Sequence, residues 1–145
     1  MQVDINKTIS YDVAKVEILG VNIGKETSGA SIYVVPYRWL AADGSVIRQN
    51  TGRYTDTELI AALGGTEEAK ATIALIATLF PEGDRPAISI RIMGTEIQVF
   101  ASHTEIVDGK QKPIIVKYSD AELAAKGVTT AMITAVIQQL AVALV

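Results

Sequence analysis

The 145-residue chain contains no cysteine, one histidine and one tryptophan. The absence of cysteine excludes disulfides, a thiolate zinc site and a cysteine nucleophile, and it leaves the redox compartment open. Charge is also scarce, because 20% of the residues are charged against about 25% in ordinary soluble domains. Hydrophobic residues make up 49% of the chain. A chain of this composition often hides part of its apolar surface against partners.

Acidic residues slightly outnumber basic ones, with 16 acidic and 13 basic residues and a net charge of −3. Nucleic-acid-binding proteins rely on cations that neutralise phosphates, so we expect no nucleic-acid partner. The N-terminus carries Asp4 and lacks the basic lead and apolar core of a signal peptide. The uncharged stretch 127–145 is interrupted by three threonines and two adjacent glutamines, and no aromatic or basic belt follows it. We therefore expect no membrane partner and, unless the protein belongs to a larger assembly, a cytoplasmic location.

Motifs of catalysis are missing as well. The chain has no G-x-S-x-G, no G-x-G-x-x-G and no P-loop pattern. A catalytic His103 would need an oriented nucleophile, but Ser102 is its neighbour in sequence, so on a strand it points to the opposite face. We predict no catalytic, cofactor-binding or metal-binding residue and no enzyme. An alternative in which His103 and a carboxylate act in a cleft stays open.

What the chain does contain is a repeat. Residues 53–63 read RYTDTELIAAL and residues 117–125 read KYSDAELAA. Seven consecutive positions match in type: basic, Tyr, Ser or Thr, Asp, small, Glu and Leu. An Asp-Gly pair precedes each copy, at Asp43-Gly44 and Asp108-Gly109, and a Gly and a Thr follow each copy. This self-similarity predicts one domain, 1–145, with an internal repeat, 13–80 and 86–145.

The repeated segment has the spacing of a helix N-terminus. Thr55 with Glu58, and Ser119 with Glu122, fit the capping box, in which the hydroxyl and the carboxylate each accept a hydrogen bond from the other residue's backbone N–H. Each cap contributes about 1 kcal/mol. The alternative is a set of paired carboxylates for metal binding or acid–base chemistry, but capping already explains the spacing. That set would be Asp56, Glu58, Asp120 and Glu122.

Hydrophobic alternation predicts strands through most of both halves. A bulge is expected at Leu19-Gly20, and Pro36 indicates an edge strand or a bulge within its own run. The Asp-Gly pairs predict tight hairpin turns. The expected strands are 2–6, 13–23, 31–40, 45–49, 88–93, 96–107 and 113–117.

Each half is expected to end in a short helix, a glycine break and a longer helix. The helices start after Thr55, Thr66, Ser119 and Thr129, and residues 81–86 form a linker between the halves. Helices that follow their strands, rather than alternating with them, favour antiparallel sheet and the α+β class. The sequence therefore predicts two pseudo-repeated βββα units packed around an approximate twofold.

One strand carries a stripe of aromatic residues. Tyr33, Tyr37 and Trp39 fall on one face of the 31–40 strand, and Arg38 lies beside them in sequence. Aromatic rings interleaved with arginine can stack on bases or sugars. An amphipathic strand can equally bury such a face in a core or a subunit contact. Both interpretations stay open, and they make these four residues candidates for contact with a ligand or a partner.

The last helix carries an apolar face without charge. Its large apolar residues recur at helical spacing, which is typical of a buried or interface helix. We expect this face to contact another subunit. The residues are Ile133, Val136, Ile137, Leu140 and Leu144.

The duplicated α+β unit, the lack of cysteine and of catalytic residues, and the uncharged last helix resemble the small accessory proteins of bacteriophage virions, such as head decoration, neck or tail subunits. The resemblance implies a non-enzymatic structural subunit that is made in the host cytoplasm and ends in the virion. Its partners would be copies of itself and other structural proteins, with strand edges and the last helix as contact surfaces. The alternative function is a small-molecule or carbohydrate-binding module that uses the Tyr33, Tyr37 and Trp39 face.

Overall fold

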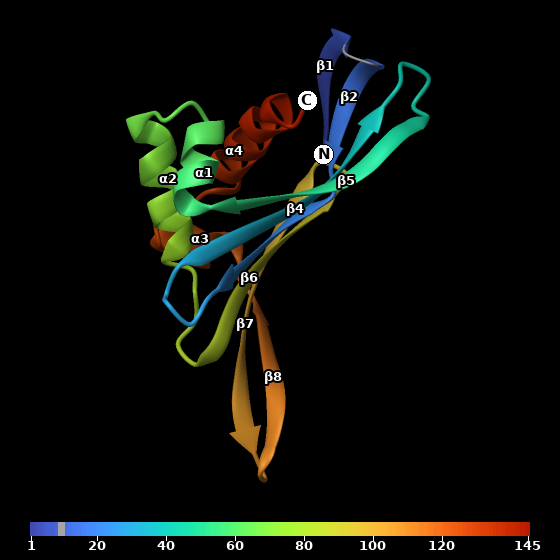
Figure 1. Cartoon of the computed structure of the whole chain (residues 1–145). Helices are drawn as coiled ribbons and strands as arrows, with labels where there is room; N and C mark the ends of the chain where they lie inside the picture. Colours follow the sequence, from blue (N-terminus) through green and yellow to red (C-terminus); the bar gives the residue numbers. More distant parts are fainter. Residues whose placement is uncertain (9–10) are drawn as a thin grey trace.

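The structure is a computed structural model that describes residues 1–8 and 11–145. Over these residues the chain forms one eight-stranded antiparallel sheet and four helices, which confirms the α+β class. Figure 1 shows the helices gathered beside the sheet and one hairpin extending away from it. The strands are β1 (Gln2–Thr8), β2 (Asp12–Ile18), β3 (Gly20–Lys25), β4 (Ser31–Leu40), β5 (Val46–Thr55), β6 (Asp84–Met93), β7 (Glu96–Val107) and β8 (Lys110–Lys117). The helices are α1 (Asp56–Ala62), α2 (Glu67–Ala77), α3 (Asp120–Ala125) and α4 (Thr130–Ala143).

Strands β2 and β3 form one line that is interrupted at Leu19. Strand β4 pairs with both of them, but Ile18 faces Tyr37 whereas Asn22 faces Val34, so one extra residue stands on the β2–β3 side. This confirms the predicted bulge. The Leu19 N–H donates to the Pro36 carbonyl at 2.9 Å. Because the nitrogen and oxygen of one strand residue point to the same neighbour, Pro36 turns its missing donor toward the bulge. Pro36 therefore lies inside a central strand next to a bulge. The bulge alternative is confirmed, and the edge-strand alternative is wrong.

Apart from β1 and β2, which have no counterparts among the described strands, the order of the sheet is symmetric about the pair β3–β6. Strands β4 and β5 lie on one side of that pair, and β7 and β8 lie on the other. Ile23 faces Ile88 across the central pair, and these residues have the same separation in sequence as Asp43 and Asp108. The two segments that match in sequence therefore occupy equivalent places, each running from an outer strand into a short helix.

Both capping boxes are present as predicted. The Glu58 N–H donates to Thr55 Oγ1 at 3.2 Å, and the Thr55 N–H donates to Glu58 Oε1 at 3.3 Å. The equivalent distances between Ser119 and Glu122 are 3.1 and 3.2 Å. The short helix α3 stops before Gly127, which has a φ of +76° that suits glycine better than other residues. Local capping thus sets where these helices begin.

Several boundaries differ from the sequence expectation: β5 continues to Thr55 beyond the expected 45–49, and β8 begins at Lys110 rather than at residue 113. Strand β6 begins at Asp84, because Asp84 pairs with Thr104 of β7, so half of the expected linker 81–86 belongs to the sheet. Helix α4 ends at Ala143 rather than continuing to Val145.

The hydrophobic core lies between the helices and one face of the sheet. From the sheet it takes side chains of β2, β3, β4, β6 and β7, and from the helices it takes the apolar stripes of all four. The opposite sheet face carries more polar residues, such as Asn22 and Ser89, whose side chains hydrogen bond at 3.1 Å. Because the central strands have one buried face, their register is well specified.

Candidate functional site

The aromatic stripe of β4 lies in the core. Tyr33 is 1% exposed and Tyr37 is 9% exposed. The Tyr33 hydroxyl donates to Asp56 Oδ1 at 2.6 Å, and burial, together with that carboxylate, raises the pKa of Tyr33 well above its ordinary value. The half-buried Trp39 donates from Nε1 to the Leu144 carbonyl at 2.9 Å. The structure therefore supports the packing interpretation, and the two tyrosine rings offer no open surface to a ligand.

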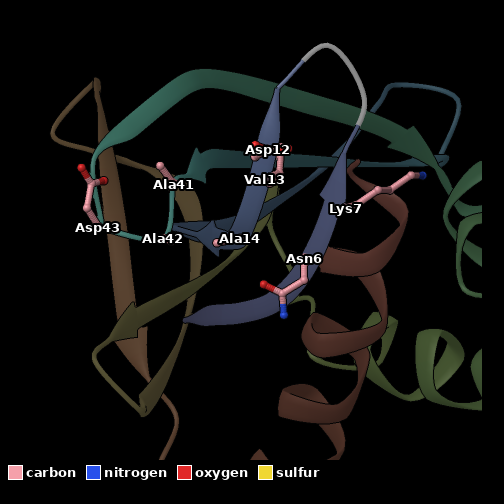
Figure 2. A pocket seen from close by; sticks show the side chains of 8 residues that line it. All are labelled: Asn6, Lys7, Asp12, Val13, Ala14, Ala41, Ala42 and Asp43. Carbon is pink, nitrogen blue, oxygen red and sulfur yellow. The ribbon is translucent and has the colours of Figure 1, made fainter.

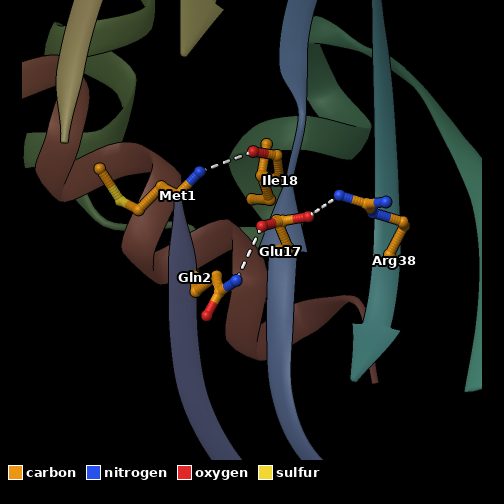
Figure 3. A network of polar contacts seen from close by, with 5 residues as sticks. All are labelled: Met1, Gln2, Glu17, Ile18 and Arg38. Atoms are coloured by element: carbon orange, nitrogen blue, oxygen red, sulfur yellow. Dashed lines mark hydrogen bonds and ion pairs between the residues drawn. The ribbon is translucent and has the colours of Figure 1, made fainter. Parts of the chain in front are cut away.

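Arg38 points to the other sheet face, where it forms an ion pair with Glu17. Gln2 Nε2 donates to the second oxygen of Glu17 at 2.9 Å, and the amine of Met1 donates to the Ile18 carbonyl at 2.9 Å. Figure 3 shows these groups joining β1, β2 and β4. The hydrogen bond from Gln2 and the contact with Arg38 lower the pKa of Glu17, although burial opposes them. The network ties three strands together and commits the Arg38 guanidinium to a residue of its own chain.

The apolar face of α4 is also part of the core. Ile133, Ile137 and Leu140 are each 2% exposed or less, Leu144 is 7% exposed, and Val136 is half-buried. These side chains cover the sheet of their own chain, so the expected contact with another subunit is corrected. The helical spacing predicts that this face is buried, but it does not tell whether the sheet of the same chain or another subunit covers it.

His103 lies on the core side of β7, as strand alternation predicts. Its Nε2 is 2.9 Å from Glu105 Oε1, and its ring lies so close to Gly83 that a Cβ there would stand 2.6 Å from His103 Cδ2. Among residues 1–8 and 11–145, no group of three or more His, Asp or Glu side chains could hold a metal ion. The capping carboxylates do not converge either, since Glu58 and Glu122 cap different helices.

The feature that the sequence analysis missed is the β7–β8 hairpin, which exposes large apolar side chains along its length. It extends beyond the rest of the sheet (Figure 1), and β8 pairs with β7 alone among the described strands. Adjacent residues of a strand point to opposite faces, so both faces of this hairpin expose large apolar side chains. These are Ile106, Val107, Ile115 and Val116, which are 72%, 40%, 59% and 50% exposed.

The free edge of β8 is interrupted by a proline. The Tyr118 N–H donates to the Val99 carbonyl, so these two facing residues form a hydrogen-bonded pair. Hydrogen-bonded and non-hydrogen-bonded pairs alternate along an antiparallel ladder, and counting from Val99–Tyr118 makes Thr104–Pro113 a non-hydrogen-bonded pair. The nitrogen of Pro113 therefore faces away from β7. A further strand could not receive a hydrogen bond at this point, and proline on an edge discourages strand addition. The faces of the hairpin, rather than its edge, are therefore suited to a contact.

An open cleft lies at the other end of the molecule, between the β1–β2 and β4–β5 hairpins. Its volume is about 530 Å³, and Figure 2 shows the side chains around it. Asp43 accepts hydrogen bonds from the hydroxyl and backbone N–H of Ser45, at 2.6 and 2.9 Å, and both lower the pKa of Asp43. The cleft thus carries a carboxylate that stays ionised at neutral pH. Its lining is Asn6, Lys7, Asp12, Val13, Ala14, Ala41, Ala42 and Asp43.

In the described part of the chain, no helix combines the length and the apolar character needed to cross a membrane. No protein-family model and no curated protein matches the chain. Among solved structures, the chain has a weak likeness to WHY3 from Arabidopsis thaliana, with 10% identity over 90% of this chain and 83% of that chain and a TM-score of 0.20. A likeness with so low a TM-score shows neither fold nor function.

Proposed function

We propose that the protein is a non-enzymatic structural subunit that assembles in multiple copies through its β7–β8 hairpin. The particle that the sequence resemblance indicates is a bacteriophage virion. The observation that carries the proposal is the exposure of Ile106 and Ile115 on one face of the hairpin and of Val107 and Val116 on the other. These four are half of the eight large hydrophobic side chains that are exposed over residues 1–8 and 11–145. Exposed apolar surface concentrated on one structural element is typical of protein contact sites.

The rest of the chain supports this interpretation because its own core is complete. The four helices bury their apolar stripes against the sheet of the same chain, so the chain needs no partner to cover that face. A two-stranded hairpin, in contrast, is only marginally stable when nothing packs against it. Packing against a second copy would cover Ile106 and Ile115 on one face and stabilise the projecting strands.

The experiment compares the wild-type chain with a variant that carries Ile106→Asp and Ile115→Asp. These residues lie on the same face of the hairpin, so the variant places two charges in the proposed contact. Light scattering coupled to size exclusion, over a series of concentrations, should show oligomers for the wild type and monomers for the variant. Val142→Asp is the matched control, because Val142 is 61% exposed on α4, and it should assemble as the wild type does.

Circular dichroism checks that the double variant keeps its fold, which we expect because both side chains are exposed. A wild type that stays monomeric at the highest attainable concentration would refute the proposed function. So would a folded double variant that assembles as well as the wild type.

A further inference from the structure

We infer that strand β5 of one copy pairs with strand β5 of a second copy, antiparallel and about a twofold axis at Thr51, so that the two sheets become continuous. This contact goes beyond the proposed function, because it uses a surface other than the β7–β8 hairpin. Figure 1 shows β5 running beside β4 from their hairpin turn to α1. Among the described strands β5 pairs with β4 alone, so its outer edge can receive a further strand.

The backbone groups at this edge can be assigned from the bulge at Leu19. The Leu19 N–H donates to the Pro36 carbonyl, so Pro36 directs its backbone oxygen to the β2–β3 side and the next residue, Tyr37, directs its groups to β5. Tyr37 faces Asn50, which therefore bonds to β4, and the residues at odd positions around it direct their N–H and carbonyl groups outward. These residues are Gln49, Thr51 and Arg53, and all three are exposed.

Two hydrogen bonds agree with this assignment. The Thr51 N–H donates to the side-chain oxygen of Asn50 at 2.8 Å, and the Thr55 N–H donates to Glu58. Both donors therefore point away from β4, as odd positions should. The bond at Thr51 involves an exposed side chain, so the carbonyl of an arriving strand can take its place.

The other two edges of the sheet, among the described strands, carry features that discourage strand addition. On β8, the nitrogen of Pro113 faces outward. On β1, the register with β2 shifts where Asn6 has a φ of +50°, so that edge is bulged. The register of β5 with β4, in contrast, is regular from Arg48 to Thr55, and this stretch contains no proline. Of the three edges, β5 is therefore the one built to accept a strand.

The side chains of β5 suit a pairing with themselves. Like charges that meet across a strand pair are destabilising, but the two arginines of β5 lie on opposite faces. Arg48 lies over the Trp39 ring, 5.7 Å from its centre, and Arg53 lies 4.0 Å from Glu26. A twofold pairing about Thr51 sets each arginine opposite an uncharged residue, which favours a second copy as the partner. The facing pairs are Thr51–Thr51, Gln49–Arg53, Asn50–Gly52 and Arg48–Tyr54.

The pairing should be weak by itself. Three hydrogen-bonded pairs centred on Thr51 supply about six backbone hydrogen bonds, and each contributes little net free energy against the cost of association. To that extent the inference rests on the proposed function, because copies held by the hairpin contact have a high effective concentration for a second contact. The variant with Ile106→Asp and Ile115→Asp should therefore still be monomeric. Two separate contact surfaces on each copy allow assemblies larger than a dimer.

The first test uses the absence of cysteine from the chain, because a single introduced thiol then reports one contact. Facing residues of a hydrogen-bonded antiparallel pair have Cα atoms about 5.5 Å apart, within the disulfide range of roughly 4.4–6.8 Å. Thr51→Cys should therefore form a disulfide-linked dimer under a mild oxidant, which non-reducing electrophoresis detects. The matched control is Thr95→Cys, which is exposed in the β6–β7 turn and should crosslink far more slowly.

The second test removes one outward N–H without removing a hydrogen bond to β4. Thr51→Pro lacks this donor, whereas its matched control, Thr51→Val, keeps the donor and the β-branched shape. In sedimentation velocity, Thr51→Pro should associate about tenfold more weakly than the wild type, equivalent to roughly 1.4 kcal/mol, and Thr51→Val should associate as the wild type does. Circular dichroism checks that both variants keep the fold.

The outcomes separate this contact from the hairpin contact. If the wild type assembles but Thr51→Cys crosslinks no faster than Thr95→Cys, the β5 contact is refuted while the proposed function stands. The same conclusion follows if folded Thr51→Pro and Thr51→Val assemble alike. A monomeric wild type whose Thr51→Cys variant still crosslinks would refute the hairpin contact alone. If the wild type is monomeric and Thr51→Cys does not crosslink, both proposals are refuted together.

Discussion

The two capping boxes allow one stability prediction to be tested twice in the same molecule. Helices α1 and α3 have seven and six residues, and helices this short are unstable by themselves. Their caps hold the first turn in place, and each helix then buries one leucine, Leu59 or Leu123, at 3% and 2% exposure. Replacing Thr55 or Ser119 with Ala removes the acceptor for one N–H and should lower the free energy of unfolding by about 1 kcal/mol.

The two sites lie in different halves of the chain and share no hydrogen-bond partner, so the double variant should lose about 2 kcal/mol. Urea unfolding followed by circular dichroism measures the losses, and the urea dependence of the free energy should stay unchanged. The control is Thr57→Ala, which also removes a threonine hydroxyl, but from a position inside helix α1 that does not cap it. It should change the free energy of unfolding by less than about 0.5 kcal/mol. If Thr57→Ala costs as much as Thr55→Ala, or if either cap variant costs nothing, the capping explanation is refuted.

Three further predictions concern the core, a strained glycine and a carboxylate. Leu140→Ala should destabilise the monomer by about 2–5 kcal/mol because it opens a cavity, whereas the exposed Val142→Ala on the same helix should cost little; equal costs in urea unfolding would contradict the burial of this face. Gly83→Ala should cost about 1–3 kcal/mol, because φ is +133° and the new methyl would overlap the His103 ring; wild-type stability in thermal unfolding would contradict this. Glu17 has a lowered pKa in the folded chain, so its ionised form stabilises the fold above the ordinary value of 4.5 and this contribution is lost as pH falls through the lower folded value. The stability gap between wild type and Glu17→Gln should therefore be largest near neutral pH and close in acid, and a constant gap would argue against the ion pair.

The parts of the fold that depend on local chemistry could be predicted from the sequence. The caps at Thr55 and Ser119 lie where the spacing placed them, because a capping box involves only four consecutive residues. The bulge at Leu19 was visible as a break in alternation. The antiparallel arrangement followed from helices that come after their strands.

The parts that depend on distant contacts could not be predicted. The stripe that contains Tyr33 is typical both of a core and of a binding face, and the choice depends on Asp56 and on helices that lie far from the strand in sequence. The same holds for Leu140. The spacing of the apolar residues on its helix predicts that it is buried, but not whether its own sheet or another subunit covers it. Ile106 and Ile115 belong to strands that were expected, but they lie on the hairpin face opposite Ala101 and the core, and alternation alone does not tell whether another chain covers that face.

The symmetry about Ile23 and Ile88 has a consequence for how this chain can vary. A protein made from two separate identical halves would have to carry every change on both sides of its axis. Here both halves belong to one polypeptide, so each half can diverge independently. In one half the outer strands β7 and β8 form the projecting hairpin. In the other half the outer strands β4 and β5 form one wall of the cleft. A single gene can in this way give its two halves different outer strands while keeping one shared scaffold.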